Sequence, residues 1–184
     1  MKLVVGLGNP GEQYRLTLHN VGFRTIDLLV AEKGWGRPSM KSAAEYWKQP
    51  MGVAPAVFMK PLTYMNLSGQ AVGEFIRYFK ISTEDTLIVS DDIELPPGTL
   101  RYREKGGHGG HNGLRSIIQH VGENFKRLRI GVGRPDGKAG VAGHVLSGAG
   151  ANAEAVEKAI ADAAEYTLEF IETGSISVRP APKT

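Results

Sequence analysis

Short apolar runs alternate with amphipathic stretches along the whole chain, and this alternation constrains the fold more than any other feature. The runs have the length of buried strands, and the stretches between them carry apolar side chains at helical spacing. This order predicts an α/β fold: a single domain over residues 1–184 with a mostly parallel, twisted sheet and helices on both faces. Strands are expected at 2–5, 43–48, 53–60, 86–90 and 128–132, and helices at 20–34, 71–79, 114–121 and about 152–173.

Polar residues mark the expected helix starts and one long loop. Asn20 is expected to cap the first helix, and Asn66 or Ser68 the second, because such side chains accept hydrogen bonds from the first free N–H groups. Residues 134–143 are expected to form a polar loop.

The first expected strand leads into a glycine-rich loop at residues 6–11 (GLGNPG), and His19 follows eight residues later. Glycine lets a ligand approach the backbone because it has no Cβ. Histidine is the side chain best suited to moving protons near neutral pH. Loop and histidine together predict half of an active site.

The same loop also matches the Gly-x-Gly-x-x-Gly pattern of dinucleotide-binding proteins. That pattern needs a helix that begins inside it and an acidic residue at the end of the second strand. Here the helix is expected only at Asn20, and Glu32 lies inside that helix. A nicotinamide-dependent oxidoreductase is therefore the least favoured interpretation, and no cofactor is expected.

Composition excludes several classes of protein and of functional site. The chain has no cysteine, which excludes disulfides, thiolate nucleophiles and cysteine-based metal sites. It has no run of about 18 apolar residues, and its first residues lack the cleavage pattern of a signal peptide. We therefore expect a cytoplasmic enzyme or binding protein with no membrane contact.

Charge is distributed unevenly along the chain. Residues 101–138 contain nine basic and three acidic residues, a local charge of +6, whereas the whole chain carries only +3. Such a cluster is typical of a surface that binds phosphates, although a solvated surface gives the same pattern.

Acidic and histidine side chains follow the expected strands. Asp91 and Asp92 come directly after the strand at 86–90, and His108 and His111 lie in a glycine-rich loop. Neither pair favours a metal site, because the aspartates lack a clear third ligand and the histidine loop holds no carboxylate.

Three asparagines, Asn9, Asn66 and Asn112, each lie in a loop marked by glycine or proline. An asparagine amide both donates and accepts hydrogen bonds, so it can hold a carbonyl, a water or an oxyanion. Together with His19 and Asp91 they predict a site that hydrolyses an uncharged ester through activated water.

Five motifs in the same order closely resemble the bacterial peptidyl-tRNA hydrolase family. They are residues 6–20 with Tyr14 and His19-Asn20, 64–69 (YMNLSG), 91–98 with Leu95-Pro96-Pro97-Gly98, 106–113 (GGHGGHNG) and 127–131 (RLRIG). The resemblance covers nearly the whole chain. It implies hydrolysis of the ester between a peptide and tRNA, with no metal, by a monomer.

The resemblance also implies roles for individual residues. His19 would be the general base, Asp91 would stabilise its charged form, and Asn112 would position the water or the oxyanion. Asn66 would bind the peptide or ester, and Asn9 would separate blocked from free aminoacyl ends. The remaining substrate-binding residues implied are Tyr14, Tyr64, Met65, Gly109 and His111.

The same resemblance implies a track for the tRNA phosphates made of Arg103, Lys105, Arg129 and Lys138. The departures from the family pattern, at Tyr64, Ser90, Arg103 and His144, remove no catalytic group. A non-catalytic RNA-binding protein on the same fold is the alternative, because a fold alone does not fix activity.

Overall fold

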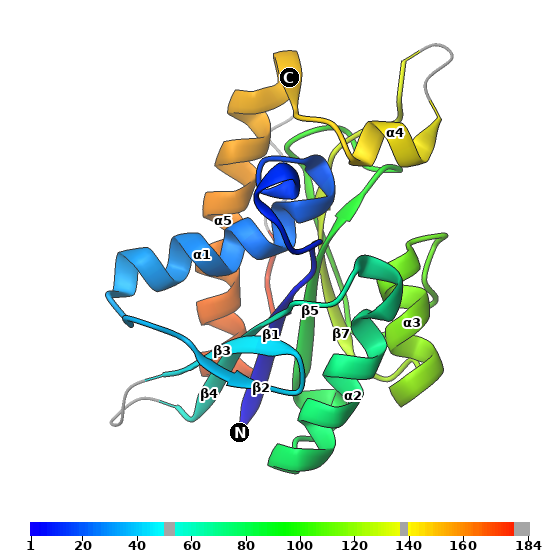
Figure 1. Ribbon diagram of the computed structural model, residues 1–184. Coiled ribbons are helices and arrows are strands. Elements are labelled where there is room, and N and C mark those ends of the chain that lie inside the picture. Colours follow the sequence, from blue (N-terminus) through cyan, green and yellow to red (C-terminus); the bar gives the residue numbers. More distant parts are fainter. Residues whose placement is uncertain (50–53, 137–139, 179–184) are drawn as a thin grey trace.

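A computed structural model describes residues 1–49, 54–136 and 140–178. Among these residues the strands form one seven-stranded sheet with the order β2-β3-β4-β1-β5-β7-β6 (Figure 1). The strands are β1 (Lys2–Gly6), β2 (Ser39–Lys41), β3 (Ala44–Lys48), β4 (Ala56–Pro61), β5 (Thr86–Asp92), β6 (Leu100–Arg103) and β7 (Lys126–Gly131).

The sheet is parallel at its centre and antiparallel at its edges. β1 pairs in parallel with β4 and β5, and β5 pairs in parallel with β7. β2, β3 and β6 join the edges in antiparallel fashion. The predicted α/β fold with a mostly parallel sheet is therefore confirmed for the central four strands.

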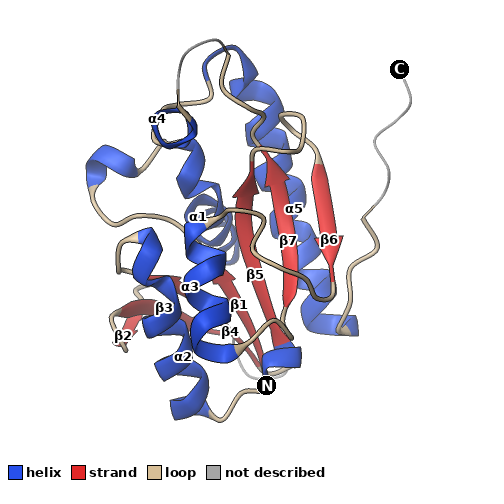
Figure 2. Cartoon of the chain, turned by 90° about the vertical axis from the view of Figure 1, so that its right-hand side faces the viewer, coloured by secondary structure: helices blue, strands red, loops and turns tan. Residues whose placement is uncertain are grey.

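Helices cover both faces of the sheet, as predicted (Figure 2). The helices α1 and α5 pack on one face with Val4, Phe58 and Leu128, and α2 and α3 pack on the other with Val5 and Ile88. None of the described helices is long and apolar enough to cross a membrane. The helices are α1 (Val21–Lys33), α2 (Ser68–Phe79), α3 (Asn112–Val121), α4 (Val141–Val145) and α5 (Ala153–Thr173).

Glycine brings α1 unusually close to the sheet. A Cβ on Gly22 would lie 2.4 Å from the carbonyl oxygen of Val89 and 2.5 Å from the nitrogen of Leu7. Leu7 N–H also donates to Val89 O at 3.0 Å, which ties the end of β1 to β5. The start of α1, directly after His19, is thereby fixed against both central strands.

Two helix-cap predictions were wrong. Asn20 is the residue before α1, but its side chain makes no cap bond and instead bonds the backbone of Asn9. Leu67 precedes α2, and Ser68 donates to Met65 O because a 3₁₀ turn at Met65–Leu67 leads into the helix.

Two boundary predictions also need correction. The expected loop at 134–143 contains the start of α4, with residues 137–139 outside the described part. The strand expected at 53–60 begins at Ala56 in β4, with residue 53 likewise undescribed.

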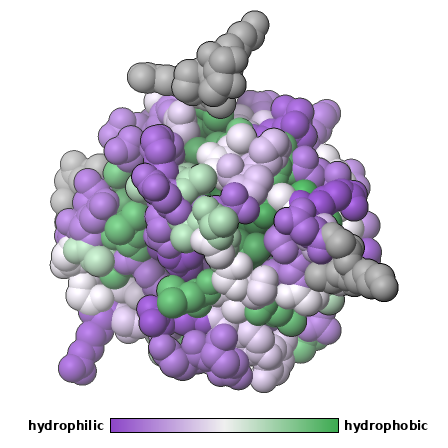
Figure 3. Space-filling model, turned by 90° about the horizontal axis from the view of Figure 1, so that it is seen from above, coloured by the Kyte–Doolittle hydropathy of each residue, from purple (hydrophilic) through white to green (hydrophobic). Residues whose placement is uncertain are grey.

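The carboxyl ends of β1, β4, β5 and β7 lie at the same edge of the sheet, because these strands are parallel. Ligand sites of open α/β sheets lie beyond this edge. Seen from there, hydrophilic side chains surround smaller hydrophobic areas (Figure 3). The candidate site residues that follow β1 and β5 are thus brought to one face.

Candidate active site

Asp91 at the end of β5 accepts hydrogen bonds from two histidines. Its Oδ1 lies 2.8 Å from His19 Nδ1 and 2.8 Å from His111 Nε2. The Asp91 side chain is 2 % exposed, and the two histidine side chains are 11 % and 10 % exposed. The two rings lie 4.9 Å apart between centroids. One carboxylate therefore fixes two imidazoles at the carboxyl edge of the sheet.

The proton position on His111 follows from its other contacts. His111 caps α3, and its Nδ1 accepts from the backbone N–H groups of Gly113 at 3.1 Å and Leu114 at 3.3 Å. A nitrogen that accepts two N–H donors carries a lone pair and no proton. His111 Nε2 therefore holds the ring proton and donates a hydrogen bond to Asp91.

The proton position on His19 follows from Asp91. Because the carboxylate can only accept when ionised, His19 Nδ1 donates to it. In the neutral ring, Nε2 then carries the lone pair. His19 thus has an available base at Nε2, whereas both nitrogens of His111 are engaged.

Asp91 is held in its ionised form. Burial alone would raise its pKa, but the electrostatic attraction to His111 and His19 and the hydrogen bonds from both rings outweigh burial and place the pKa below its ordinary range. Asp91 therefore stays an acceptor throughout the neutral and mildly acidic range.

The same three residues offer ligand atoms within 4.8 Å of one another, a spacing that suits a metal ion. Two histidines and a carboxylate are a common ligand set for transition metals. However, His111 Nε2 carries the proton fixed by the α3 cap, so it has no lone pair for a metal. The donor set therefore fits a proton-transfer site better than a metal site.

Asn9 is fixed by its neighbours in the loop after β1. Asn9 Oδ1 accepts from Met65 N at 2.8 Å, and Asn20 bonds the Asn9 backbone through both ends of its amide, at 2.9 and 3.0 Å. Both asparagines are buried. With its oxygen accepting from Met65, the Asn9 amide has its NH₂ group left as a donor.

Two arginines on β7 hold the glycine-rich loop that carries His111. Arg127 is fully buried and donates to the carbonyls of Gly106 and Phe125. Arg129 donates to Gly107 O at 3.2 Å and pairs with Asp92 at 3.5 Å. Burial, together with the charge of Arg129, lowers the pKa of Arg127 to about 10, so it stays cationic at neutral pH.

The other residues expected at the site lie around its rim. Asn112 begins α3, is exposed, and accepts from Arg115 at 3.3 Å. Met65 is buried beneath Asn9, whereas Tyr64 and Asn66 beside it are exposed. Tyr14 is half-buried, and Gly109 is exposed within the glycine-rich loop.

The basic residues expected to bind the tRNA phosphates differ in how many contacts they already make within the protein. Arg103 and Lys105 are exposed, and neither has an ion-pair partner among the residues that the structure describes. Arg129 is committed to the loop and to Asp92, so it is less available to a ligand. Lys138 lies outside the described residues.

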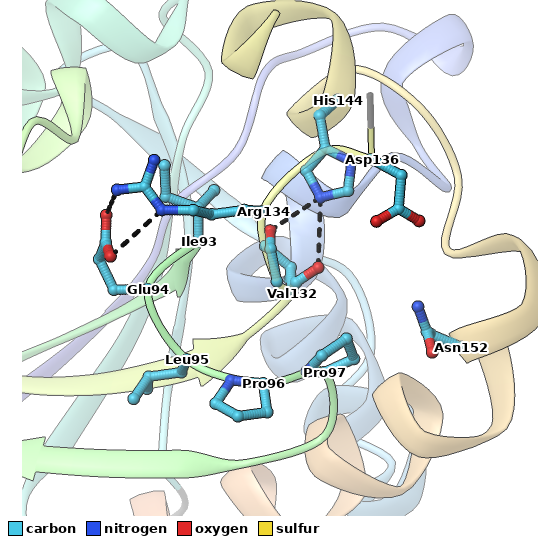
Figure 4. A pocket seen from close by; sticks show the side chains of 11 residues that line it. Ile93, Glu94, Leu95, Pro96, Pro97, Val132, Arg134, Asp136, His144 and Asn152 are labelled. Atoms are coloured by element: carbon cyan, nitrogen blue, oxygen red, sulfur yellow. Dashed lines mark hydrogen bonds and ion pairs between the residues drawn. The ribbon is translucent and has the colours of Figure 1, made fainter. Parts of the chain in front are cut away.

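Two hollows are lined by residues that follow the central strands, and neither His19 nor His111 lines them. One, of about 470 Å³, lies beyond β5 and β7, where His144 of α4 donates to the carbonyls of Val132 and Gly133 at 3.2 and 2.9 Å (Figure 4). On its rim, Arg134 pairs with Glu94. The other, of about 370 Å³, begins at Asn9 and Asn20 on the opposite side, over β4 and β3.

Sequence reasoning did not give Asn20 or Arg127 a place in the site. Asn20 was visible as the residue after His19, but its position before a helix favoured capping. Arg127 begins the motif at 127–131, but the motif assigned it no role, and burial was not expected because arginine side chains are rarely fully buried.

The chain is similar in sequence and fold to proteins named peptidyl-tRNA hydrolase. A family model described as peptidyl-tRNA hydrolase matches residues 3–180. The peptidyl-tRNA hydrolase of Paracoccus denitrificans is 46% identical over 147 residues, which are 80% of this chain and 63% of that protein. The one from Oceanobacillus iheyensis is 42% identical over 173 residues, which are 94% of this chain and 91% of that protein.

The crystal structure of peptidyl-tRNA hydrolase from Acinetobacter baumannii superposes with a TM-score of 0.82 at 39% identity. The match covers 93% of this chain and 86% of that chain. The chain thus spans somewhat less than two thirds of the Paracoccus relative but most of the Acinetobacter one.

Proposed function

This chain belongs to the peptidyl-tRNA hydrolase family, and we propose that it hydrolyses the ester bond between a peptide and tRNA. The proposal rests on membership of the family and on the geometry at Asp91. The single observation that carries it is the chain of hydrogen bonds that leaves His19 Nε2 as an available base.

In the proposed reaction, His19 Nε2 takes a proton from a water molecule, and the hydroxide attacks the ester carbonyl. The tetrahedral intermediate carries an oxyanion, for which the amides of Asn112 and Asn66 are candidate donors. Collapse of the intermediate breaks the bond to the ribose oxygen. The His19 imidazolium returns its proton to that oxygen, which leaves free tRNA and a peptide acid.

Asp91 accepts from His19 Nδ1, so it stabilises the imidazolium that forms when His19 takes the proton. His111 contributes indirectly, because its fixed Nε2–H holds the other side of the same oxygen. His111 is thus a positioning residue in this proposal, since both of its ring nitrogens are engaged by Asp91 and by the start of α3.

Asn9 supports a preference for blocked substrates. Its oxygen is occupied by Met65 N–H, so its NH₂ faces a substrate as a donor. A peptidyl end has a carbonyl that can accept this bond, and a free aminoacyl end has an ammonium group instead. A donor left without an acceptor costs binding free energy, so the unblocked substrate is disfavoured.

The tRNA half of the substrate would lie over β6 and β7. Arg103 and Lys105 are exposed there without ion-pair partners among the described residues, so they are available to phosphates near the acceptor end. Tyr14 and Tyr64 would contact the nucleotide end. The proposal includes a monomer that acts in the cytoplasm, where translation supplies the substrate.

A single-turnover assay tests the proposal. The chain is mixed with N-acetyl-aminoacyl-tRNA, and the release of free tRNA is followed with and without a metal chelator. We expect rapid cleavage that the chelator does not change. The variant His19→Asn, which keeps a polar side chain of similar length, should bind the tRNA with unchanged affinity and not cleave it.

The outcomes separate the alternatives. Tight binding of tRNA with no ester cleavage by the native chain would identify a non-catalytic RNA-binding protein. Equal cleavage of N-acetylated and free aminoacyl-tRNA would retain the hydrolase and remove the role proposed for Asn9. The variant Asn9→Ala provides the matched test, since it should reduce the preference for the blocked substrate.

A further inference from the structure

The two sides of the catalytic histidine differ in charge. On the β7 and β6 side, Arg103 and Lys105 are exposed cations without ion-pair partners among the described residues. On the β4 and β3 side, the cations of the hollow are paired: Arg15 with Glu12 at 2.8 Å, and Lys60 with Asp27 at 2.6 Å. Only the first side is suited to a phosphate backbone.

The hollow on the second side joins the site through Asn9. Asn9 and Asn20 line it, and Asn20 follows His19 in the chain. Pro10, Phe23 and Leu62 provide apolar surface within it. The carbonyl that Asn9 is proposed to bind belongs to the residue before the ester-linked one, so that residue lies next to the hollow that Asn9 lines.

The rim of the hollow has an excess of negative charge. It carries the carboxylates of Glu12, Asp27 and Glu45 and the cations of Arg15 and Lys60. Lys60 is 12 % exposed and lies between two carboxylates, because Glu45 is 3.2 Å from the Nζ that Asp27 also contacts. One carboxylate charge is thus left over, which repels phosphates and favours a cationic ligand group.

We infer that this hollow is the subsite for the peptide residue one step before the ester-linked residue, and that it favours a basic side chain there over an acidic one. The inference rests on the proposed hydrolysis of peptidyl-tRNA. The apolar surface of Phe23 and Leu62 accommodates the stem of a lysine or arginine, while Glu45 and Asp27 meet its charge. An acidic side chain meets the same carboxylates and is repelled.

The experiment uses three substrates with the same tRNA and the same ester-linked glycine. The preceding residue is lysine, alanine or glutamate, and every peptide is N-acetylated. For each enzyme, kcat/KM is divided by that for N-acetyl-glycyl-tRNA, which has no residue for the hollow. The native chain should prefer lysine over glutamate about two- to fivefold, the range that a partly exposed ion pair supplies.

Two variants move this preference in opposite directions. Glu45→Gln removes the excess carboxylate and should bring the lysine-to-glutamate ratio close to one. Lys60→Gln removes a cation and should increase the ratio. The control Glu165→Gln removes the same charge from the exposed side of α5 and should leave the ratio unchanged. Circular dichroism checks that every variant is folded; if Lys60→Gln is unfolded, Glu45→Gln decides.

The failures are distinguishable. If the native chain cleaves none of these substrates, the proposed function is wrong and the subsite falls with it. If it cleaves all three and the ratio is the same in the native chain, Glu45→Gln and Lys60→Gln, the hydrolase stands and the subsite is wrong.

Discussion

Two loops each deliver one histidine to Asp91, yet they are fixed by different means. The loop after β1, residues 7–20, is held by close backbone approach and by the Asn9–Asn20 amide bonds. The loop after β6, residues 104–111, is held from below by the buried cation of Arg127 and by Arg129. The first loop leaves a nitrogen of its histidine available, and the second engages both nitrogens of its histidine.

Glycine is required for a different physical reason in each of the two regions. At Gly22, which supports the first loop, the limit is space, because an added Cβ would overlap the backbone of Val89 and Leu7. At Gly110, in the second loop, nothing lies within 4 Å of an added Cβ, and the limit is the backbone angle φ of +83°. Glycine-rich sequence alone does not distinguish these cases.

The largest expected difference between the two loops is the effect on kcat of removing the histidine that each one carries. His19→Ala should lower kcat by about 10²–10⁴-fold, because it removes the proposed general base. His111→Ala should lower it only about tenfold, because it removes a positioning contact and leaves the base. Single-turnover rates for both variants test this, and an equal loss in the two would place His111 in the chemistry itself.

A rescue variant refines the role of His111. Asn can cap a helix, so His111→Asn should recover the stability lost in His111→Ala, about 1 kcal/mol. It should not recover the rate if the Nε2–H bond to Asp91 is what positions the carboxylate. Thermal unfolding and kcat, measured on the same preparations, separate capping from positioning.

Substitution of the glycines that support the two loops should destabilise the protein by different amounts. Gly22→Ala should destabilise the protein by about 3 kcal/mol, because the new methyl group meets the backbone of Val89 in β5 and of Leu7 just after β1. Gly110→Ala should cost about 1 kcal/mol, the strain of a left-handed angle without a clash. Urea unfolding measures both, and equal costs would remove the distinction between space and angle.

Much of this arrangement could be predicted from the sequence. Apolar runs placed Lys2–Val5 and the 86–90 segment in strands, and parallel strands bring His19 and Asp91 to one edge. The roles of Asn20 and His111 could not be predicted. A polar residue before a helix caps it or bonds elsewhere according to side-chain direction, which tertiary packing decides. Here Asn20 bonds Asn9, and His111 does the capping.

Asp91, which joins the loops, should link stability to pH. The pKa of Asp91 in the folded protein is below its ordinary value of 3.8, so its ionised form stabilises the fold. This contribution is fully present above the unfolded-state pKa and is lost as the pH falls through the lower, folded-state pKa. Asp91→Asn should therefore destabilise the protein by about 2 kcal/mol at pH 7.

The difference in free energy of unfolding between the native chain and Asp91→Asn should be constant from pH 7 to about pH 5. It should shrink below about pH 4. Denaturant unfolding across this range measures it. The rate of Asp91→Asn should fall less than that of His19→Ala, because the base remains. A stability difference that does not change down to pH 3 would show that the carboxylate is not held ionised by its two histidines.

The smallest expected effect concerns the charges of the two loops. Arg15 in the first loop is paired with Glu12, whereas Lys105 in the second has no ion-pair partner among the described residues. Lys105 is therefore the cation free to meet a phosphate, and each phosphate contact contributes roughly 0.7–0.9 to the log–log slope of binding against salt. Lys105→Gln should flatten the slope for tRNA by about that amount and raise the apparent KM a few-fold.

The choice of Lys105 over Arg129 matters, because Arg129 also holds the loop through Gly107 and its removal would disturb His111. Lys33→Gln, an equal charge change at the exposed end of α1, is the control and should leave the slope unchanged. The loss should be confined to tRNA substrates, since a peptide ester of adenosine is too short to reach Lys105. If Lys105→Gln slows cleavage of the adenosine ester as much as that of full tRNA, the residue acts on the loop that carries His111, and the second loop is not where the phosphates bind.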